Sequence, residues 1–231
     1  SKKNKIIKKI NFSSKEITNN KLSIIFKKNN FKFKYIDKIL FCSVVPQNFN
    51  LIKNFLSKKT NRKCYEVKSL NLKSLIQVKV DFNQVGSDRI TNAISLMNGT
   101  NNFIIIDFGT ATTFDVIIKK TYYGGIIAPG VKLSLNSLSD KAKLIPKIDL
   151  KKITKVIGKN TISAVRSGFF WGYAGLIDNI INLINKETRK TFKVILTGGY
   201  SGLFKNSIKT KVTQNQDITI KGLIKISRLI K

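Results

Sequence analysis

The feature that most constrains this chain is the stretch from Phe103 to Gly130, which reads FIIIDFGTATTFDVIIKKTYYGGIIAPG. An apolar run delivers Asp107 to a glycine-containing bend. The residues after this bend predict a second strand over 111–118 and, after a short turn, a third strand over 124–128. Three such strands in succession predict an antiparallel meander with a small polar loop at its first bend.

The loop at this bend combines residue types that suit a phosphate and a cation. Asp107 offers a carboxylate, Gly109 can adopt positive φ, and Thr110 offers a hydroxyl beside bare backbone N–H groups. Thr112 and Thr113 add further hydroxyls. The alternative is an ordinary β-hairpin, in which the Asp and Thr side chains satisfy their own backbone.

The composition excludes several kinds of site. The chain of 231 residues is 42% hydrophobic and can fill a core, and it contains no histidine. Its two cysteines, Cys42 and Cys64, form no CxxC pair, so a zinc site and a His-based triad are excluded. We expect Cys42 in the core. The chain has no apolar run long enough to span a membrane and does not begin like a secretory signal, so we expect a cytoplasmic protein without a membrane partner.

The net charge of +31 suggests nucleic acid as a partner, because basic faces bind phosphate backbones. The lysines, however, are scattered through every segment, and specific recognition relies on arginine forks. We therefore expect only unspecific attraction to polyanions. Only 12 residues are acidic, so an acid in a glycine-rich setting calls for an explanation. Of the 43 basic residues only five are arginine: Arg62, Arg89, Arg166, Arg189 and Arg228.

A second motif, GSDR, precedes a predicted helix in the segment 85–99. Ser87 or Asp88 is a good N-cap, and Gly99 is placed to end the helix. A carboxylate beside the guanidinium of Arg89, at a helix N-terminus that favours anions, can accept a substrate proton and hold an anionic partner. The alternative is plain capping of the helix.

Two further motifs follow the meander. Thr161 is an N-cap candidate for a helix on which Gly168, Gly172 and Gly175 clear one face. Glycines inside a helix are destabilising, so another helix, including one of a second subunit, or a ligand is expected to come close. Further on, the segment 193–202 predicts a strand, a Gly-Gly corner and a helix from Ser201, a flat site over which a nucleotide base can lie.

These motifs occur in one order: GSDR, IDFGTATTFDV with GGIIAPG, NTISAVRSGFFWGYAGLID, and TGG. Together they resemble the type III pantothenate kinase family, within the superfamily of acetate and sugar kinases, heat-shock chaperone ATPases and actin. The resemblance runs from about Ile39 to Lys231. It implies an α/β, ribonuclease-H-like fold of two lobes, 1–99 and 100–231, with ATP between them, in a homodimer.

The resemblance also implies a reaction, the ATP-dependent phosphorylation of pantothenate to 4'-phosphopantothenate in coenzyme A biosynthesis, with Mg²⁺ and a monovalent cation, K⁺ or NH₄⁺. A set without histidine or cysteine is sufficient in kind, because phosphoryl transfer needs mainly positioning and charge neutralisation. The implied roles are general base for Asp88, pantothenate binding for Gly86, Ser87, Asp88, Arg89 and Thr161, cation binding for Asp107, ATP phosphate binding for Gly109 and Thr110, and adenosine binding for Gly198 and Gly199.

The chain departs from the family pattern in two ways. The D-x-G-N-T loop that begins the family's first lobe is absent from residues 1–30, so either the chain lacks its true N-terminus or the loop has been lost. Lys79 and Phe82 stand where the family usually has Tyr and Pro, which affects the implied pantothenate pocket. Two other functions remain open: a degenerate member acting as a binding or transcription accessory protein, and a nucleic-acid-binding protein.

Overall fold

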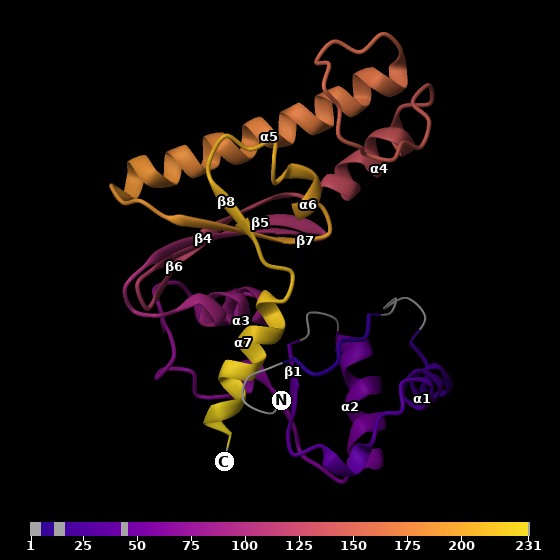
Figure 1. Ribbon diagram of the computed structural model, residues 1–231, viewed down its shortest axis with the longest axis vertical. Coiled ribbons are helices and arrows are strands. Elements are labelled where there is room, and N and C mark those ends of the chain that lie inside the picture. Colours follow the sequence, from indigo (N-terminus) through magenta and orange to yellow (C-terminus); the bar gives the residue numbers. More distant parts are fainter. Residues whose placement is uncertain (1–5, 12–16, 43–45, 231) are drawn as a thin grey trace. The chain divides into compact units, whose positions relative to one another are not determined.

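The computed structural model describes residues 6–11, 17–42 and 46–230. The chain divides into two compact units (Figure 1). The predicted lobes, 1–99 and 100–231, remain a prediction, and the compact units differ from them at three segments. Residues 76–82 and 96–99 belong to the second unit, and residues 219–231 belong to the first. The first unit comprises 1–75, 83–95 and 219–231, and the second comprises 76–82 and 96–218.

The second unit is built on a six-stranded sheet with the order β3-β6-β5-β4-β7-β8. The strands β4, β5 and β6 form the antiparallel meander predicted from the sequence, while β7 and β8 continue the sheet in parallel on the other side of β4. This order confirms the ribonuclease-H-like α/β fold. The strands are β3 (Gln77–Val78), β4 (Asn102–Phe108), β5 (Ala111–Ile118), β6 (Thr121–Pro129), β7 (Lys193–Gly198) and β8 (Val212–Gln214).

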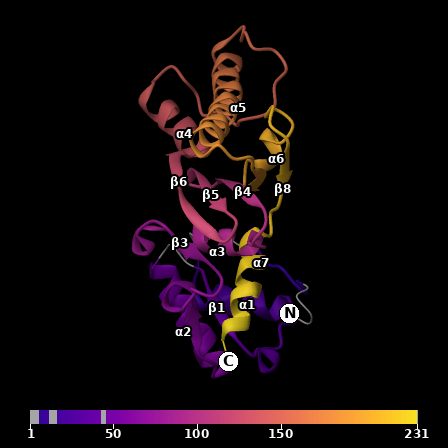
Figure 2. The same cartoon turned by 90° about the vertical axis from the view of Figure 1, so that its left-hand side faces the viewer.

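The long helix α5 (Thr161–Thr188) covers one face of this sheet (Figures 1 and 2). Its buried residues recur every three or four positions and pack against Ile104 and Ile106 of β4 in one apolar core. The connection from β6 to α5 includes α4 (Val131–Lys141), and α6 (Ser201–Phe204) follows β7. Because alternate residues of a strand face opposite sides, Asp107 points away from this core.

The first unit contains a β-α-β element, β1 (Ile39–Phe41), α2 (Pro46–Thr60) and β2 (Cys64–Glu66), in which the strands are parallel. The apolar run 39–45, which ends at Pro46, and the helical spacing after it predict a βα unit here, and the structure confirms this unit. Residues 43–45 lie outside the described residues. The remaining helices are α1 (Asn19–Lys28), α3 (Ser87–Leu96) and α7 (Ile218–Ile226), with short 3-10 turns at 33–35, 67–69, 82–84 and 227–229.

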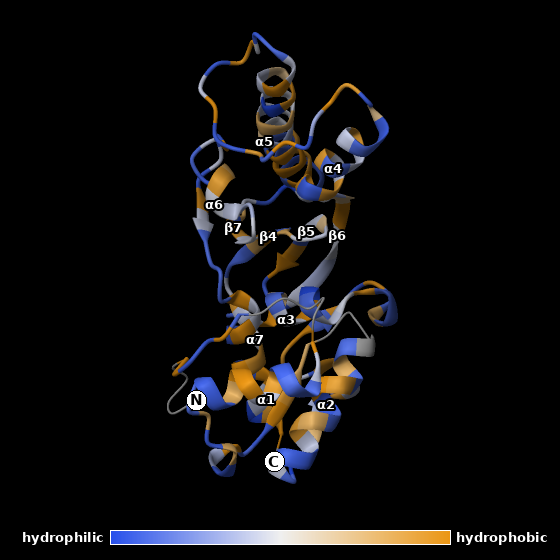
Figure 3. Cartoon of the chain, turned by 90° about the vertical axis from the view of Figure 1, so that its right-hand side faces the viewer, coloured by the Kyte–Doolittle hydropathy of each residue, from blue (hydrophilic) through white to orange (hydrophobic). Residues whose placement is uncertain are grey.

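Helix α7 is largely apolar, as its colour in Figure 3 shows, and it packs closely on α3. A Cβ atom added to Gly222 would lie 2.1 Å from the carbonyl oxygen of Thr91. The two helices can therefore come this close only because Gly222 has no side chain. Beside this contact the Thr219 hydroxyl donates to the Asn92 side chain at 2.7 Å. The helix that carries the GSDR motif is therefore fixed by the C-terminal segment of the chain.

Candidate functional site

Asp88 lies in the first turn of α3. The helix begins at Ser87, and the carbonyl oxygen of Gly86 accepts a hydrogen bond from the Ile90 N–H at 3.2 Å. Gly86 therefore occupies the capping position that we predicted for Ser87 or Asp88. The prediction was wrong because the Ser87 side chain is buried and engages Cys42, which leaves the glycine outside the first turn.

The carboxylate of Asp88 folds back over the start of its own helix. Its Oδ1 accepts the Arg89 backbone N–H at 2.9 Å. A Cβ atom on Gly86 would lie 2.4 Å from this same oxygen, so the glycine leaves the space that the carboxylate occupies. Asp88 and Arg89 are both only half-buried. An ionised carboxylate is favourable at this end of a helix.

Cys42, the residue after β1, packs against the first turn of α3. The Cys42 thiol lies 3.7 Å from the Ser87 hydroxyl and 3.4 Å from the Thr91 hydroxyl, which itself donates to the Ser87 carbonyl oxygen at 2.6 Å. Burial raises the pKa of the Cys42 thiol above its ordinary value. Cys42 is only partly buried, so it lies at the edge of the core in which we expected it.

Asp107 sits in a row of oxygen-bearing side chains on one face of the second unit's sheet. The register of the strands places Thr113 of β5 opposite Asp107 on one side and Thr197 of β7 opposite it on the other. Directly paired residues project from the same face. The Thr113 hydroxyl oxygen is buried and has no hydrogen-bond partner among the residues that the structure describes. The row offers oxygen ligands of the kind that hard cations prefer.

The bend after Asp107 is a tight hairpin that packs against the start of α4. The Gly109 N–H donates to the Ala111 carbonyl oxygen at 3.0 Å. A Cβ atom added to Gly130, the residue before α4, would lie 2.0 Å from the Thr110 carbonyl oxygen. The hairpin backbone therefore lies directly against the N-terminus of this helix, where anions are favoured. Both Gly109 and Thr110 are exposed.

Gly109 does not use the conformational freedom that we expected of it. The glycines with positive φ in the described chain are Gly99, Gly124 and Gly198. A Cβ atom on Gly109 would only meet the Ala111 carbonyl oxygen at 3.6 Å, an ordinary contact. The close approach to this hairpin is instead at Gly130, the residue that precedes α4.

The Gly-Gly corner after β7 meets the hairpin at Asp107. Gly198 has φ of +83°, and a Cβ atom there would lie 2.6 Å from Asp107 Oδ1. The Gly199 N–H donates to the Phe108 carbonyl oxygen at 3.0 Å. Two motifs that are far apart in the sequence, DFGT and TGG, thus lie side by side at the carboxyl ends of the parallel strands β4 and β7.

Thr161 is the first residue of α5 and is exposed. The N-cap is Asn160, so the capping role predicted for Thr161 was wrong. Asn160 forms a capping box with Ser163: its side-chain oxygen accepts the Ser163 N–H at 2.9 Å, and the Ser163 hydroxyl oxygen accepts the Asn160 N–H at 3.1 Å. The hydroxyl of Thr161 is therefore not needed for the cap.

The glycine face of α5 is open. Cβ atoms added at Gly168, Gly172 and Gly175 would meet no atom of the described chain within 4 Å. The close neighbour that the sequence predicted for this face is thus not supplied by the described part of the chain itself.

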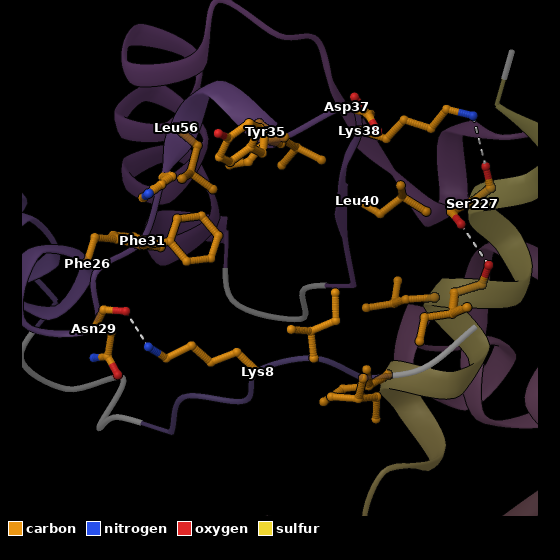
Figure 4. A pocket seen from close by; sticks show the side chains of 18 of the residues that line it. Lys8, Phe26, Asn29, Phe31, Tyr35, Asp37, Lys38, Leu40, Leu56 and Ser227 are labelled. Atoms are coloured by element: carbon orange, nitrogen blue, oxygen red, sulfur yellow. Dashed lines mark hydrogen bonds between the residues drawn. The ribbon is translucent and has the colours of Figure 1, made fainter. Parts of the chain in front are cut away.

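The first unit also contains a groove of about 1170 Å³, whose lining is shown in Figure 4. Its walls are largely apolar, with Phe26, Phe31 and Leu56 on one side and Leu40 on the opposite side (Figure 4). Lys38 Nζ reaches across to the Ser227 carbonyl oxygen at 3.5 Å. None of the predicted site residues lines this groove.

Two general features complete the description. Within the described residues, no three His, Cys, Asp or Glu side chains come together as a metal site would require. Every helix in the described part of the chain is too short or too polar to serve as a membrane span.

Comparison with known proteins identifies the family to which the chain is similar. Residues 2–183 match the model of the type III pantothenate kinases. A type III pantothenate kinase of Pelagibacter ubique (strain HTCC1062) is 63% identical over 229 residues, covering 99% of this chain and 92% of the relative. The corresponding protein of Syntrophotalea carbinolica is 37% identical over 194 residues, covering 83% of this chain and 76% of the relative.

Among solved structures, a Campylobacter jejuni protein assigned to the Baf family of transcriptional activators superposes with a TM-score of 0.54. The match covers 88% of this chain and 87% of that protein, with 21% identical residues. At this level of identity the similarity concerns the fold.

Proposed function

Because the chain belongs to the type III pantothenate kinase family, we propose that it transfers the γ-phosphoryl group of ATP to the hydroxyl of pantothenate, the first step of coenzyme A biosynthesis. The structural observation that carries the proposal is the meeting of the DFGT hairpin and the TGG corner around Asp107. Phosphoryl transfer needs positioning and neutralisation of charge more than covalent chemistry, and this chain offers residues of that kind.

The second unit would hold the donor. The exposed hairpin residues Gly109 and Thr110 would bind the phosphates, supported by the N-terminus of α4 beside them. Gly198 and Gly199 would lie under the adenosine, since a corner without side chains lets a flat base approach the backbone.

Asp107 would bind the monovalent cation, K⁺ or NH₄⁺. The fit is supported by the buried, unpartnered hydroxyl oxygen of Thr113 in the paired position beside it. Such an ion would offset the negative charge of the ATP phosphates. Mg²⁺ would take most of its ligands from phosphate oxygens and water, because the described residues contain no cluster of three acidic, His or Cys side chains.

The first unit would act on the acceptor. Asp88 would take the proton from the pantothenate hydroxyl as its oxygen forms a bond to the γ-phosphorus and the bond to the ADP oxygen breaks. Gly86, Ser87 and Arg89 would hold pantothenate, Arg89 by its charge. Thr161 of the second unit would add a further contact to the substrate.

We further propose a cytoplasmic homodimer in which the glycine face of α5 lies in the interface. The support is that Gly168, Gly172 and Gly175 have free space within the described chain, while Leu133 of α4 and Leu183 of α5 are 55% and 53% exposed. Light scattering of the protein and of a Gly172→Leu variant tests this. Dimeric wild type and a monomeric, folded variant are expected, and a dimer in both excludes this face.

The activity is tested by measuring ADP formation with pantothenate and ATP, with and without K⁺. We expect Asp88→Asn to lower kcat by roughly 10²–10⁴-fold, because the amide cannot accept the proton. Asp140→Asn, at an exposed position of α4, is the matched control and should leave the rate unchanged.

Two outcomes would contradict the assignment. Equal rates for Asp88→Asn and wild type would remove Asp88 as the base. Wild-type protein that is folded and inactive with pantothenate in the presence of K⁺ and Mg²⁺ would favour the alternative, a degenerate member acting as a binding or transcription accessory protein.

A further inference from the structure

The Gly-Gly corner that meets Asp107 is held from its other side by a buried serine. Ser201, the first residue of α6, is 0% exposed. Its hydroxyl donates to the Gly198 carbonyl oxygen at 2.8 Å and accepts from the side-chain amides of Gln214 at 2.9 Å and Gln216 at 2.7 Å. A hydroxyl has one hydrogen to donate and two lone pairs, so the bonding capacity of Ser201 is fully used.

Gln216 makes a second hydrogen bond to the same corner. Its amide nitrogen donates to the Gly198 carbonyl oxygen at 3.2 Å as well as to Ser201. Both hydrogens of an exposed side-chain amide are thus directed at the protein rather than at water. The side chain of Gln216 is thereby held against the corner.

The other side of the corner leaves no room for movement. A Cβ atom added to Gly198 would lie 2.6 Å from Asp107 Oδ1, and the Gly199 N–H is bonded to the Phe108 carbonyl oxygen. A displacement of the corner toward β4 would bring it against the Asp107 carboxylate, and a displacement away from β4 would break the hydrogen bond between Gly199 and Phe108. The hydrogen bonds from Ser201 and Gln216 hold the Gly198 carbonyl oxygen in place. A fully connected network of this kind makes a backbone segment rigid.

We propose that Gln216, acting through Ser201 and Gly198, is a positioning residue that fixes the Gly198–Gly199 corner for nucleotide binding. Gln214 supports it through the same hydroxyl. The inference rests on the proposed function in one respect, that ATP lies over this corner. Gln216 itself does not react. It holds the corner in the binding conformation before ATP arrives, which lowers the entropy loss on binding ATP.

The test compares two variants of the full chain, Gln216→Ala and Gln216→Glu. The first removes both hydrogen bonds. The second keeps the size of the side chain but places a carboxylate, which has no hydrogen to donate, against the Gly198 carbonyl oxygen. For both we expect KM for ATP to rise roughly tenfold, the loss that one to two hydrogen bonds produce, with KM for pantothenate unchanged.

The matched control is Gln77→Ala. Gln77 is another exposed glutamine of the second unit, on β3, where its side-chain oxygen accepts the Thr121 hydroxyl at 3.2 Å. Its removal should leave both KM values as they are. Thermal unfolding is measured for all variants, and we expect no appreciable change of Tm, because Gln216 is exposed.

Unchanged KM for ATP in both Gln216 variants would overturn the inference. Equal increases of the KM values for ATP and pantothenate, or a large drop of Tm, would indicate a general structural role and would overturn it as well. Binding of a non-hydrolysable ATP analogue, measured by calorimetry, separates this from a failure of the proposed function. Wild type that binds no analogue contradicts the ATP site as a whole. Wild type and variants that bind it equally contradict only the role of Gln216.

Discussion

Two groups of glycines in the second unit differ in what surrounds them. Around the hairpin, Cβ atoms on Gly130 and Gly198 would collide with Thr110 and Asp107 at 2.0 and 2.6 Å. On α5, Cβ atoms at Gly168, Gly172 and Gly175 would meet no atom of the described residues within 4 Å. The first group is required by close packing inside the chain. The second group is not explained by packing within the described residues.

The largest effect is expected where crowding and backbone strain coincide. Gly198→Ala would force a side chain into a left-handed conformation and against Asp107 Oδ1. We expect it to lower the free energy of unfolding by roughly 3 kcal/mol or more and to abolish ATP binding. Urea denaturation followed by circular dichroism gives the first quantity. A variant as stable as wild type would show that the corner adapts, which removes the distinction between the two groups.

The same crowding occurs in the first unit at Gly222, although its φ is not in the left-handed region. Gly222→Ala places a methyl group against the Thr91 carbonyl oxygen and would push α7 from α3. We expect a loss of roughly 1–3 kcal/mol, typical of an overpacked core. Because α3 carries Asp88, kcat should fall as well. Full activity at unchanged stability would contradict the close contact of these helices.

The open group should respond in the opposite direction. Gly172→Ala adds no contact within the described chain and removes the entropic disadvantage of glycine in a helix. At protein concentrations low enough to keep the chain monomeric, we expect the free energy of unfolding to rise by roughly 0.5–1 kcal/mol. Denaturant titration at several concentrations measures it. Destabilisation at every concentration would mean that the face is occupied within the monomer.

The smallest effect is expected at Gly109. It lies in the hairpin, but its φ is not positive and a Cβ atom has ordinary space there. Gly109→Ala should therefore change stability by less than about 0.5 kcal/mol. An increase of KM for ATP without a change of Tm would then report the added methyl group against the phosphates. A large loss of stability would place Gly109 with the crowded group.

Much of the second unit could be predicted from the sequence, because local patterns determine it. Apolar runs broken by a glycine bend gave the meander around Asp107, and the order of motifs gave the family. The βα unit of the first unit, β1 and α2, followed from an apolar run and the helical spacing after it. In these segments the residues that decide the structure are neighbours in the chain.

The helix starts were predicted less well. Ser87, Asp88 and Thr161 were all plausible caps, but the structure uses Gly86 and Asn160. At α3 the position of the cap depends on Cys42, which is distant in the sequence and contacts the Ser87 hydroxyl. At α5 a local signal was available, since Asn three residues before Ser163 is a capping-box pattern.

The contacts that hold the Gly198–Gly199 corner and the hairpin could not be predicted from one sequence. Gln216 is one of many polar residues in a lysine- and asparagine-rich chain, and nothing nearby marks its bonds to Ser201 and Gly198. Gly130 likewise fits a strand end equally well. Both acquire their meaning only when segments distant in the sequence are brought together by the sheet.

The contact between Thr110 and Gly130 limits how this protein can be re-engineered. Since the hairpin backbone rests on the residue that precedes α4, neither segment can be exchanged or lengthened without the other being displaced. A transplant of the hairpin into another scaffold would have to carry residues 107–130 as one piece, together with the first turn of the following helix.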